Sequence, residues 1–252
     1  ASAAQNTGPR LSANGNAEQD MAQLWQSVVA ILRDIARYPA LQSGRLRAIG
    51  LAGQGEGVWL SDAEGEPVGP GILWSDTRSR DLMSELLSRP GFDRRFFDDT
   101  GTHLQPCNTS MQLYWLKHHR PERLAAARYL FFAKDWIRFR LTGVAALDLT
   151  DASTSLLNQQ SGKLSTVVLN EMGLADLQSL FPPLLAPDAQ AGTLREEVAA
   201  LTGLPTATPV AAGALDVCSA ALGCGAVNDG DIYTILGTTC CTRSEERRVG
   251  KE

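Results

Sequence analysis

Short apolar runs that end in glycine alternate with helical patterns along this chain, and the alternation limits the folds open to it. Residues 46–53, "LRAIGLAG", and residues 208–215, "TPVAAGAL", have the apolar composition and length of strands and finish beside glycine-containing turns. Residues 17–40 repeat their apolar side chains at helical spacing. Strands that alternate with helices predict an α/β domain with a mixed sheet and flanking helices.

The overall composition is that of a globular protein and excludes several classes of partner. Of the 252 residues, 44% are hydrophobic, which is enough for a buried core. The net charge is −5 and there is no long run of Lys or Arg, so we expect no nucleic-acid partner. No apolar run is long enough to span a bilayer and the first twenty residues contain no signal peptide, so we expect no membrane partner and a cytoplasmic location.

The cysteines and glycines exclude several common sites. The five cysteines form no C-x-x-C pair, so we expect reduced thiols and no metal site made by the protein. A dinucleotide-binding fingerprint fails because Val58 and Asn228 stand where its third glycine should be. The sequence also contains neither a G-x-x-x-x-G-K-[ST] loop nor a G-x-S-x-G nucleophile turn.

Polar and aromatic side chains gather at three predicted strand ends. These are Gln54 and Glu56 after the first strand, Trp74, Asp76 and Arg78 after a second, and Asp216 after a third. Open α/β sheets bind ligands at the carboxyl ends of their strands. An aromatic ring can cover C–H edges while carboxylates accept hydroxyl protons, so the combination favours a polyhydroxylated ligand.

Each of these features also has a purely structural interpretation. Asp216 could be the N-cap of the helix that follows it. Trp74 could belong to the core, and Asp76 with Arg78 could form a surface ion pair of little energetic weight. Residues 237–239 could form an ordinary turn.

The order of the motifs resembles the FGGY family of carbohydrate kinases, in its polyol and ketose branch. The resemblance runs from about residue 14 to residue 242. It rests on "GQGEG" 53–57, "WSDTR" 74–78, "KDWIRFRLTG" 134–143, "DAS" 151–153, "GALD" 213–216 and "GTT" 237–239.

The resemblance implies an actin-like (ribonuclease H-like) ATPase fold and the use of ATP with Mg²⁺. It also implies phosphorylation of a primary hydroxyl on a small polyol or ketose, with Asp216 as the catalytic base. The substrate would be bound by Gln54, Gly55, Glu56, Trp74, Asp76 and Arg78, and the last two would also order the strand end beside it. Gly237, Thr238 and Thr239 would bind the ATP phosphates.

The resemblance also implies boundaries within the chain. Residues 1–226 would be the N-terminal sugar-binding lobe without its first strands, and residues 227–242 would begin the C-terminal nucleotide-binding lobe. Residues 243–252 form a charged tail that could be foreign to the fold. Because the family has further segments on both sides, we expect a fragment that is inactive alone.

Two points stay open at the level of the sequence. The alternative function is a non-catalytic sugar-binding or regulatory module that keeps the acceptor site without phosphoryl transfer. The full-length protein could also form a homodimer.

Overall fold

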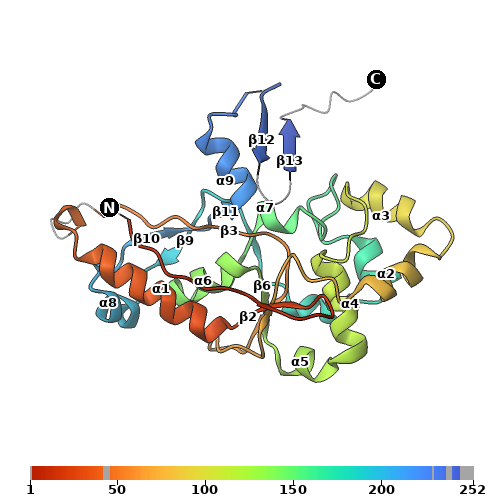
Figure 1. The fold of residues 1–252 in the computed structure, drawn as a ribbon, viewed down its shortest axis with the longest axis horizontal. Coiled ribbons are helices and arrows are strands. Elements are labelled where there is room, and N and C mark those ends of the chain that lie inside the picture. The colour runs from red at the N-terminus through yellow and green to blue at the C-terminus, as the bar shows by residue number, and fades with distance from the viewer. Residues whose placement is uncertain (1, 42–45, 229, 237–239, 245–252) are drawn as a thin grey trace.

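The computed structural model describes residues 2–41, 46–228, 230–236 and 240–244. Most of these residues form one body of helices and short strands, from whose upper side in Figure 1 the helix α9 and the strands β12 and β13 project. Among the described residues, no helix is both long and apolar enough to cross a bilayer.

The strands are short and pair in both orientations, as the sequence predicts for a mixed α/β fold. β1–β2–β5, β4–β6, β9–β10 and β12–β13 pair antiparallel, whereas β3–β11 and β7–β8 pair parallel. The strands are β1 (Arg10–Leu11), β2 (Ala17–Gln19), β3 (Ala52–Gly53), β4 (Trp59–Ser61), β5 (Gly71–Ile72), β6 (Tyr129–Phe131), β7 (Leu147–Asp148), β8 (Leu184–Leu185), β9 (Gln190–Thr193), β10 (Pro209–Ala211), β11 (Ala214–Leu215), β12 (Ile232–Leu236) and β13 (Cys240–Ser244).

The described part of the chain also contains α-helices. They are α1 (Met21–Ala36), α2 (Arg80–Leu87), α3 (Phe92–Thr100), α4 (Thr109–His119), α5 (Pro121–Ala126), α6 (Ala133–Thr142), α7 (Leu149–Ala152), α8 (Glu196–Thr202) and α9 (Asp216–Gly223). A π-helical segment over Val167–Glu171 and a 3₁₀ helix over Ala175–Leu180 lie between α7 and α8 in the chain.

The first helix begins later than its apolar pattern predicts. Residues 17–19 form β2, which pairs with β1 and β5, and the helix starts at Met21. The backbone N–H of Gln23 donates to the Asp20 carboxylate at 3.0 Å, so Asp20 is the N-cap. The prediction of a helix from residue 17 is therefore wrong for residues 17–19, which form a strand.

The main core lies where β4 and β6 meet the helices α4 and α6. Trp59, Leu60 and Phe131 on the two strands are fully buried. The rings of Trp59 and Trp136 stack with their centroids 6.3 Å apart, which ties β4 to α6. A second, smaller cluster packs α8 and β10 against α1.

A buried ion pair holds the end of β5 against β2. Asp76 is fully buried and accepts from the backbone N–H of Ala17 at 2.6 Å. The guanidinium of Arg78 donates to Asp76 at 2.8 and 2.7 Å and to Glu18 at 2.7 Å. The same guanidinium lies 5.0 Å from the centre of the Trp115 ring. The interpretation as a surface ion pair is therefore wrong, and the pair orders the chain at this strand end.

We predict that Asp76→Ala lowers the free energy of unfolding by about 3–5 kcal/mol, because it leaves the buried Arg78 with Glu18 as its remaining carboxylate partner. Asp81→Ala, on the exposed face of α2, is the matched control and should change it by less than about 0.5 kcal/mol. Urea denaturation measures both. A loss below about 1 kcal/mol for Asp76→Ala would contradict the buried-pair interpretation.

Candidate functional site

The loops after β3 and β11 leave the same edge of a parallel strand pair. Leu215 lies opposite Gly53 in the register, so Glu56 and Asp216 both follow this edge. A Cβ at Gly55 would overlap the Leu215 side chain and the Asp151 carboxylate, so any larger residue would force these side chains to shift. Glu56 and Asp216 each stand one Cα–Cα step of about 3.8 Å from this close contact. The backbone segments that carry Glu56 and Asp216 thus lie close together at this edge.

Asp216 is the first residue of α9, and its carboxylate is exposed. Leu215 occupies the N-cap position, and the backbone N–H of Val217 donates to Asp216 Oδ1 at 2.7 Å. Asp216 therefore satisfies one amide of its own helix without being the N-cap. Its exposure at the strand edge leaves the carboxylate accessible to a ligand.

Glu56 is held in a demanding conformation by four hydrogen bonds. Its backbone φ of 54° lies in the left-handed region, which residues other than glycine rarely adopt. Asn108 Nδ2 donates to Oε1 at 3.0 Å, whereas the backbone N–H of Thr109, its Oγ1 and Ser155 Oγ donate to Oε2 at 2.7, 2.8 and 3.0 Å. Thr109 is the first residue of α4, so Glu56 also anchors that helix.

The remaining predicted substrate residues differ in their access to solvent. Trp74 is 46% exposed, so its ring is not part of the core. Gln54 lies half-buried in the loop after β3. Asp76 and Arg78 are engaged in the buried pair described above. The residues predicted to bind ATP phosphates, 237–239, lie outside the described residues.

A buried network of charged side chains lies directly beneath this edge. The Lys134 ammonium is 3.1 Å from Asp135 Oδ1, 3.1 Å from Asp148 Oδ2 and in short contact with Asp151 Oδ2. Arg138 donates to Asp135 Oδ1 at 2.6 Å. All five side chains are almost completely excluded from solvent, so each charge depends on the others.

The network reaches the backbone that carries Asp216. Arg138 donates to the carbonyl of Ala212 at 2.8 Å. Thr150 Oγ1 donates to Asp148 and accepts the backbone N–H of Leu215 at 2.9 Å. These bonds fix the chain on both sides of the turn that leads into β11. Sequence reasoning used the motifs at 134–143 and 151–153 for the family resemblance but did not predict this network.

The network contains more carboxylates than cations. Three carboxylates face Lys134 and Arg138, and Asp151 Oδ1 is buried with no hydrogen-bond partner among the described residues. Burial raises the pKa of Asp151 to about 8, although Lys134 acts in the opposite direction. The same carboxylates raise the pKa of Lys134, against the effect of its burial. A proton on Asp151 would balance the buried charge.

A polar pocket of about 410 Å³ opens beside Glu56. We call it the Glu56 pocket; its lining residues are Glu56, Thr100, Gly101, Thr102, Asn108, Ser153, Thr154 and Gln159. The residues come from the loop after β3, from the end of α3 and the loop that leads on to α4, and from the segment after α7. The pocket therefore lies beside the loop that carries Glu56.

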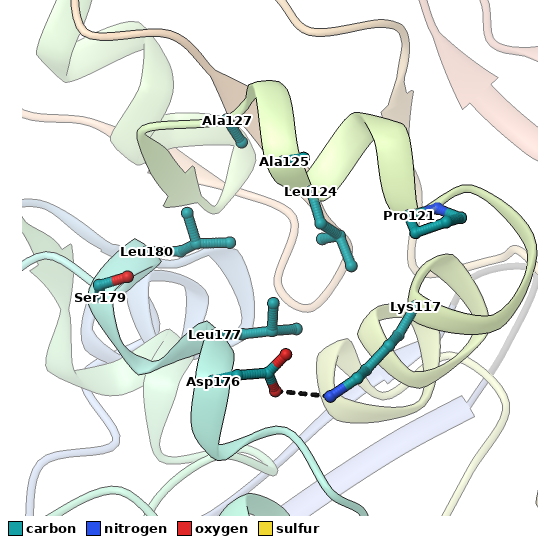
Figure 2. A pocket seen from close by; sticks show the side chains of 9 residues that line it. All are labelled: Lys117, Pro121, Leu124, Ala125, Ala127, Asp176, Leu177, Ser179 and Leu180. Atoms are coloured by element: carbon teal, nitrogen blue, oxygen red, sulfur yellow. Dashed lines mark hydrogen bonds and ion pairs between the residues drawn. The ribbon is translucent and has the colours of Figure 1, made fainter.

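Figure 2 shows a second pocket, of about 470 Å³, between α5 and the 3₁₀ helix. Leu124, Leu177 and Leu180 point into it, and the ion pair of Lys117 with Asp176 lies at one side. None of the predicted site residues lines this pocket. The polar strand edge is therefore the better candidate for a functional site.

We predict that Asp151→Asn flattens the dependence of stability on pH. The folded protein keeps a proton on Asp151 up to about pH 8, whereas a free carboxyl releases it near 3.8. The unfolded state thus binds fewer protons between these values, so this group lowers the free energy of unfolding as pH rises, by at most about 1.4 kcal/mol per pH unit.

Urea denaturation across this pH window measures the effect, and the exposed Asp188→Asn is the control. The wild type should lose stability relative to Asp151→Asn as pH rises, whereas Asp188→Asn should follow the wild type. Parallel curves for the wild type and Asp151→Asn would contradict a proton held by the network.

Sequence comparison shows which known proteins this chain is similar to. The erythritol kinase of Brucella abortus (strain 2308) is 35% identical over 213 residues, which cover 84% of this chain and 41% of that protein. The L-xylulose/3-keto-L-gulonate kinase of Escherichia coli (strain K12) is 31% identical over 229 residues, 90% of this chain and 46% of that protein. The chain thus spans less than half the length of these relatives.

Solved structures give the same fold. A xylulose kinase from Rhodospirillum rubrum superposes with a TM-score of 0.82 at 28% identity, over 91% of this chain and 48% of that one. A xyloylose kinase from Brucella ovis gives 0.81 at 32% identity, over 94% and 48%. The predicted actin-like fold is confirmed. The model of the N-terminal domain of the FGGY carbohydrate kinases matches residues 2–223, and the chain therefore belongs to the FGGY family of carbohydrate kinases.

Proposed function

We propose that the protein containing this chain transfers a phosphoryl group from ATP to a primary hydroxyl of a small polyol or ketose. The observation that supports the proposal is that Glu56 and the exposed Asp216 follow the ends of two adjacent parallel strands, with the Glu56 pocket beside the first of them. Membership of the family and the relatives named erythritol kinase and L-xylulose kinase support it.

Asp216 is assigned the role of general base. Its carboxylate accepts the proton of the attacking hydroxyl, which makes the oxygen a better nucleophile. The bond from Val217 orients the carboxylate, and the bond from Leu215 to Thr150 fixes the backbone just before it. Most of the remaining catalysis in phosphoryl transfer comes from positioning and charge stabilisation.

Glu56 and Trp74 are assigned to the substrate. Two carboxylate oxygens offer about four acceptor positions, and the one described bond to Glu56 Oε1 leaves capacity for a ligand hydroxyl. The half-exposed ring of Trp74 offers a surface for C–H groups. Gln54 and Gly55 form the part of the loop that leads from β3 to Glu56, and Asp76 with Arg78 orders the end of β5.

Bound ATP would supply the phosphoryl group, and Mg²⁺ would neutralise the negative charge of its phosphates. We assign its phosphates to Gly237, Thr238 and Thr239, which the family motif matches. Dependence on ATP fits a cytoplasmic location, which forms part of the proposal. A non-catalytic sugar-binding module is the competing function, and it requires the same pocket without turnover.

Asp216→Asn in the full-length protein should reduce kcat by about 10²–10⁴-fold, because it removes the proton acceptor and keeps the shape of the side chain. The KM for the polyol should change little. Steady-state assays with ATP, Mg²⁺ and a C4 or C5 polyol measure both. Asp188→Asn is the control for removing a carboxylate elsewhere. A loss below about threefold would assign Asp216 to the helix terminus instead.

Glu56→Gln in the same protein should raise the KM for the polyol by about tenfold or more and leave the KM for ATP nearly unchanged. The reason is that the lost carboxylate charge is assigned to the hydroxyls of the polyol and not to ATP. The exposed Glu64→Gln is the matched control. An equal rise in both KM values would remove Glu56 from the acceptor site.

A further inference from the structure

The Glu56 pocket is lined by polar side chains and one glycine, and its hydrogen-bonding character can be worked out atom by atom. Three of its hydroxyl groups donate their protons to backbone carbonyls of the protein. Thr100 donates to Phe96 at 2.8 Å. Ser153 and Thr154 donate to Thr150 and Asp151 at 2.9 and 2.7 Å. What these hydroxyls can offer a ligand is therefore the lone pairs of their oxygens.

The other polar groups of the pocket have the same bias. Glu56 contributes a carboxylate, which only accepts. The amide of Asn108 donates to Glu56, and that of Gln159 donates to the carbonyl of Ser153 at 3.0 Å, so each has already used one N–H. None of the residues that line the pocket, all of which the structure describes, is Lys, Arg or His. The wall is thus rich in acceptors and poor in donors.

A wall of this kind suits a ligand that brings hydrogen-bond donors and no negative charge. Each hydroxyl of a polyol supplies one proton to such acceptors. A carboxylate or phosphate could only accept, and it would also meet the charge of Glu56. Trp74 is not among the residues that line the pocket, so a cyclic sugar placed within it has no flat apolar surface against its C–H face.

The pocket is also placed to hold the end of a chain whose other end reacts. α7 begins at Leu149 and is followed by Ser153 and Thr154, which line the pocket. At the start of the same helix, Thr150 holds the N–H of Leu215, the residue before Asp216. The same short helix thus contacts the backbone before Asp216 at its start and leads into the pocket wall at its end.

We propose that the Glu56 pocket is a subsite for the far end of an uncharged, open-chain polyol or ketose, and that it rejects acceptors ending in a carboxylate. This inference rests on the proposed function for the assignment of the reacting end to Asp216. The selectivity itself comes from the pocket, whose lining lies entirely within this chain.

Binding to the 252-residue chain without ATP tests the selectivity separately from catalysis. The probes are xylitol and xylonate, which have five carbons each and differ at one terminus, with xylopyranose as the cyclic counterpart. Isothermal calorimetry or ligand-observed NMR should give xylitol a Kd at least about tenfold lower than xylonate, because the anion lacks a donor and is repelled by Glu56. Xylopyranose should also bind more weakly than xylitol.

Two variant pairs locate the effect. Thr154→Val removes the acceptor oxygen and should weaken xylitol binding by about three- to tenfold, whereas Thr154→Ser should retain it. Gln159→Lys places a cation at the pocket, and it should shift the preference towards xylonate by about tenfold. Gln160→Lys makes the same charge change at the next, exposed residue, which does not line the pocket, and should leave the preference unchanged.

The proposal is overturned if xylonate or xylopyranose binds as tightly as xylitol, or if Gln159→Lys and Gln160→Lys act alike. It is also overturned if xylitol fails to bind at tens of millimolar to a chain whose circular dichroism shows it to be folded. Selective binding by this chain together with no turnover by the full-length protein would retain the subsite and refute the kinase function.

Discussion

The contact between Lys134 and three buried aspartates is the interaction on which this structure most depends. Each of these buried charges would strongly destabilise the folded state if its partners were missing. Lys134 and the three aspartates must therefore come together as the chain folds. They arise from α6, from β7 and from α7, and Arg138 adds a bond to the carbonyl of Ala212. One ammonium group thereby fixes the relative positions of several short elements that have few backbone hydrogen bonds of their own.

This arrangement explains how a region of small residues can support a defined site. β3 and β11 contain two residues each, so their own pairing cannot hold the turn before Asp216 firmly. The network adds the bond from Leu215 to Thr150, and glycine at position 55 lets the two loops approach closely. Glu56 is fixed independently through α4 and Ser155. The two carboxylates are therefore positioned by different parts of the fold that meet at one edge.

The sequence predicts the parts of this site that depend on local pattern. A strand that ends in "GALD" and continues as a helix of small residues is visible in the chain, and so is the glycine-rich turn that carries Glu56. The burial of Lys134 and Arg138 is not, because charged residues are usually exposed and their partners lie in other elements. α3 was not predicted either: its charged residues obscure the helical spacing of the buried Phe92 and Phe96. The strand at residues 17–19 depends on pairing with β1 and β5, which local pattern does not contain.

In the proposed function, one edge, formed by the loops after β3 and β11, binds the acceptor. Titration of xylitol into the isotopically labelled chain, followed by amide chemical shifts, tests it most directly. We expect the amides of Gly55, Glu56 and Val217 to shift together with one saturation curve, and those around Lys117 and Leu180, in the pocket of Figure 2, to stay constant. Shifts confined to the latter pocket, or different affinities at the two loops, would contradict it.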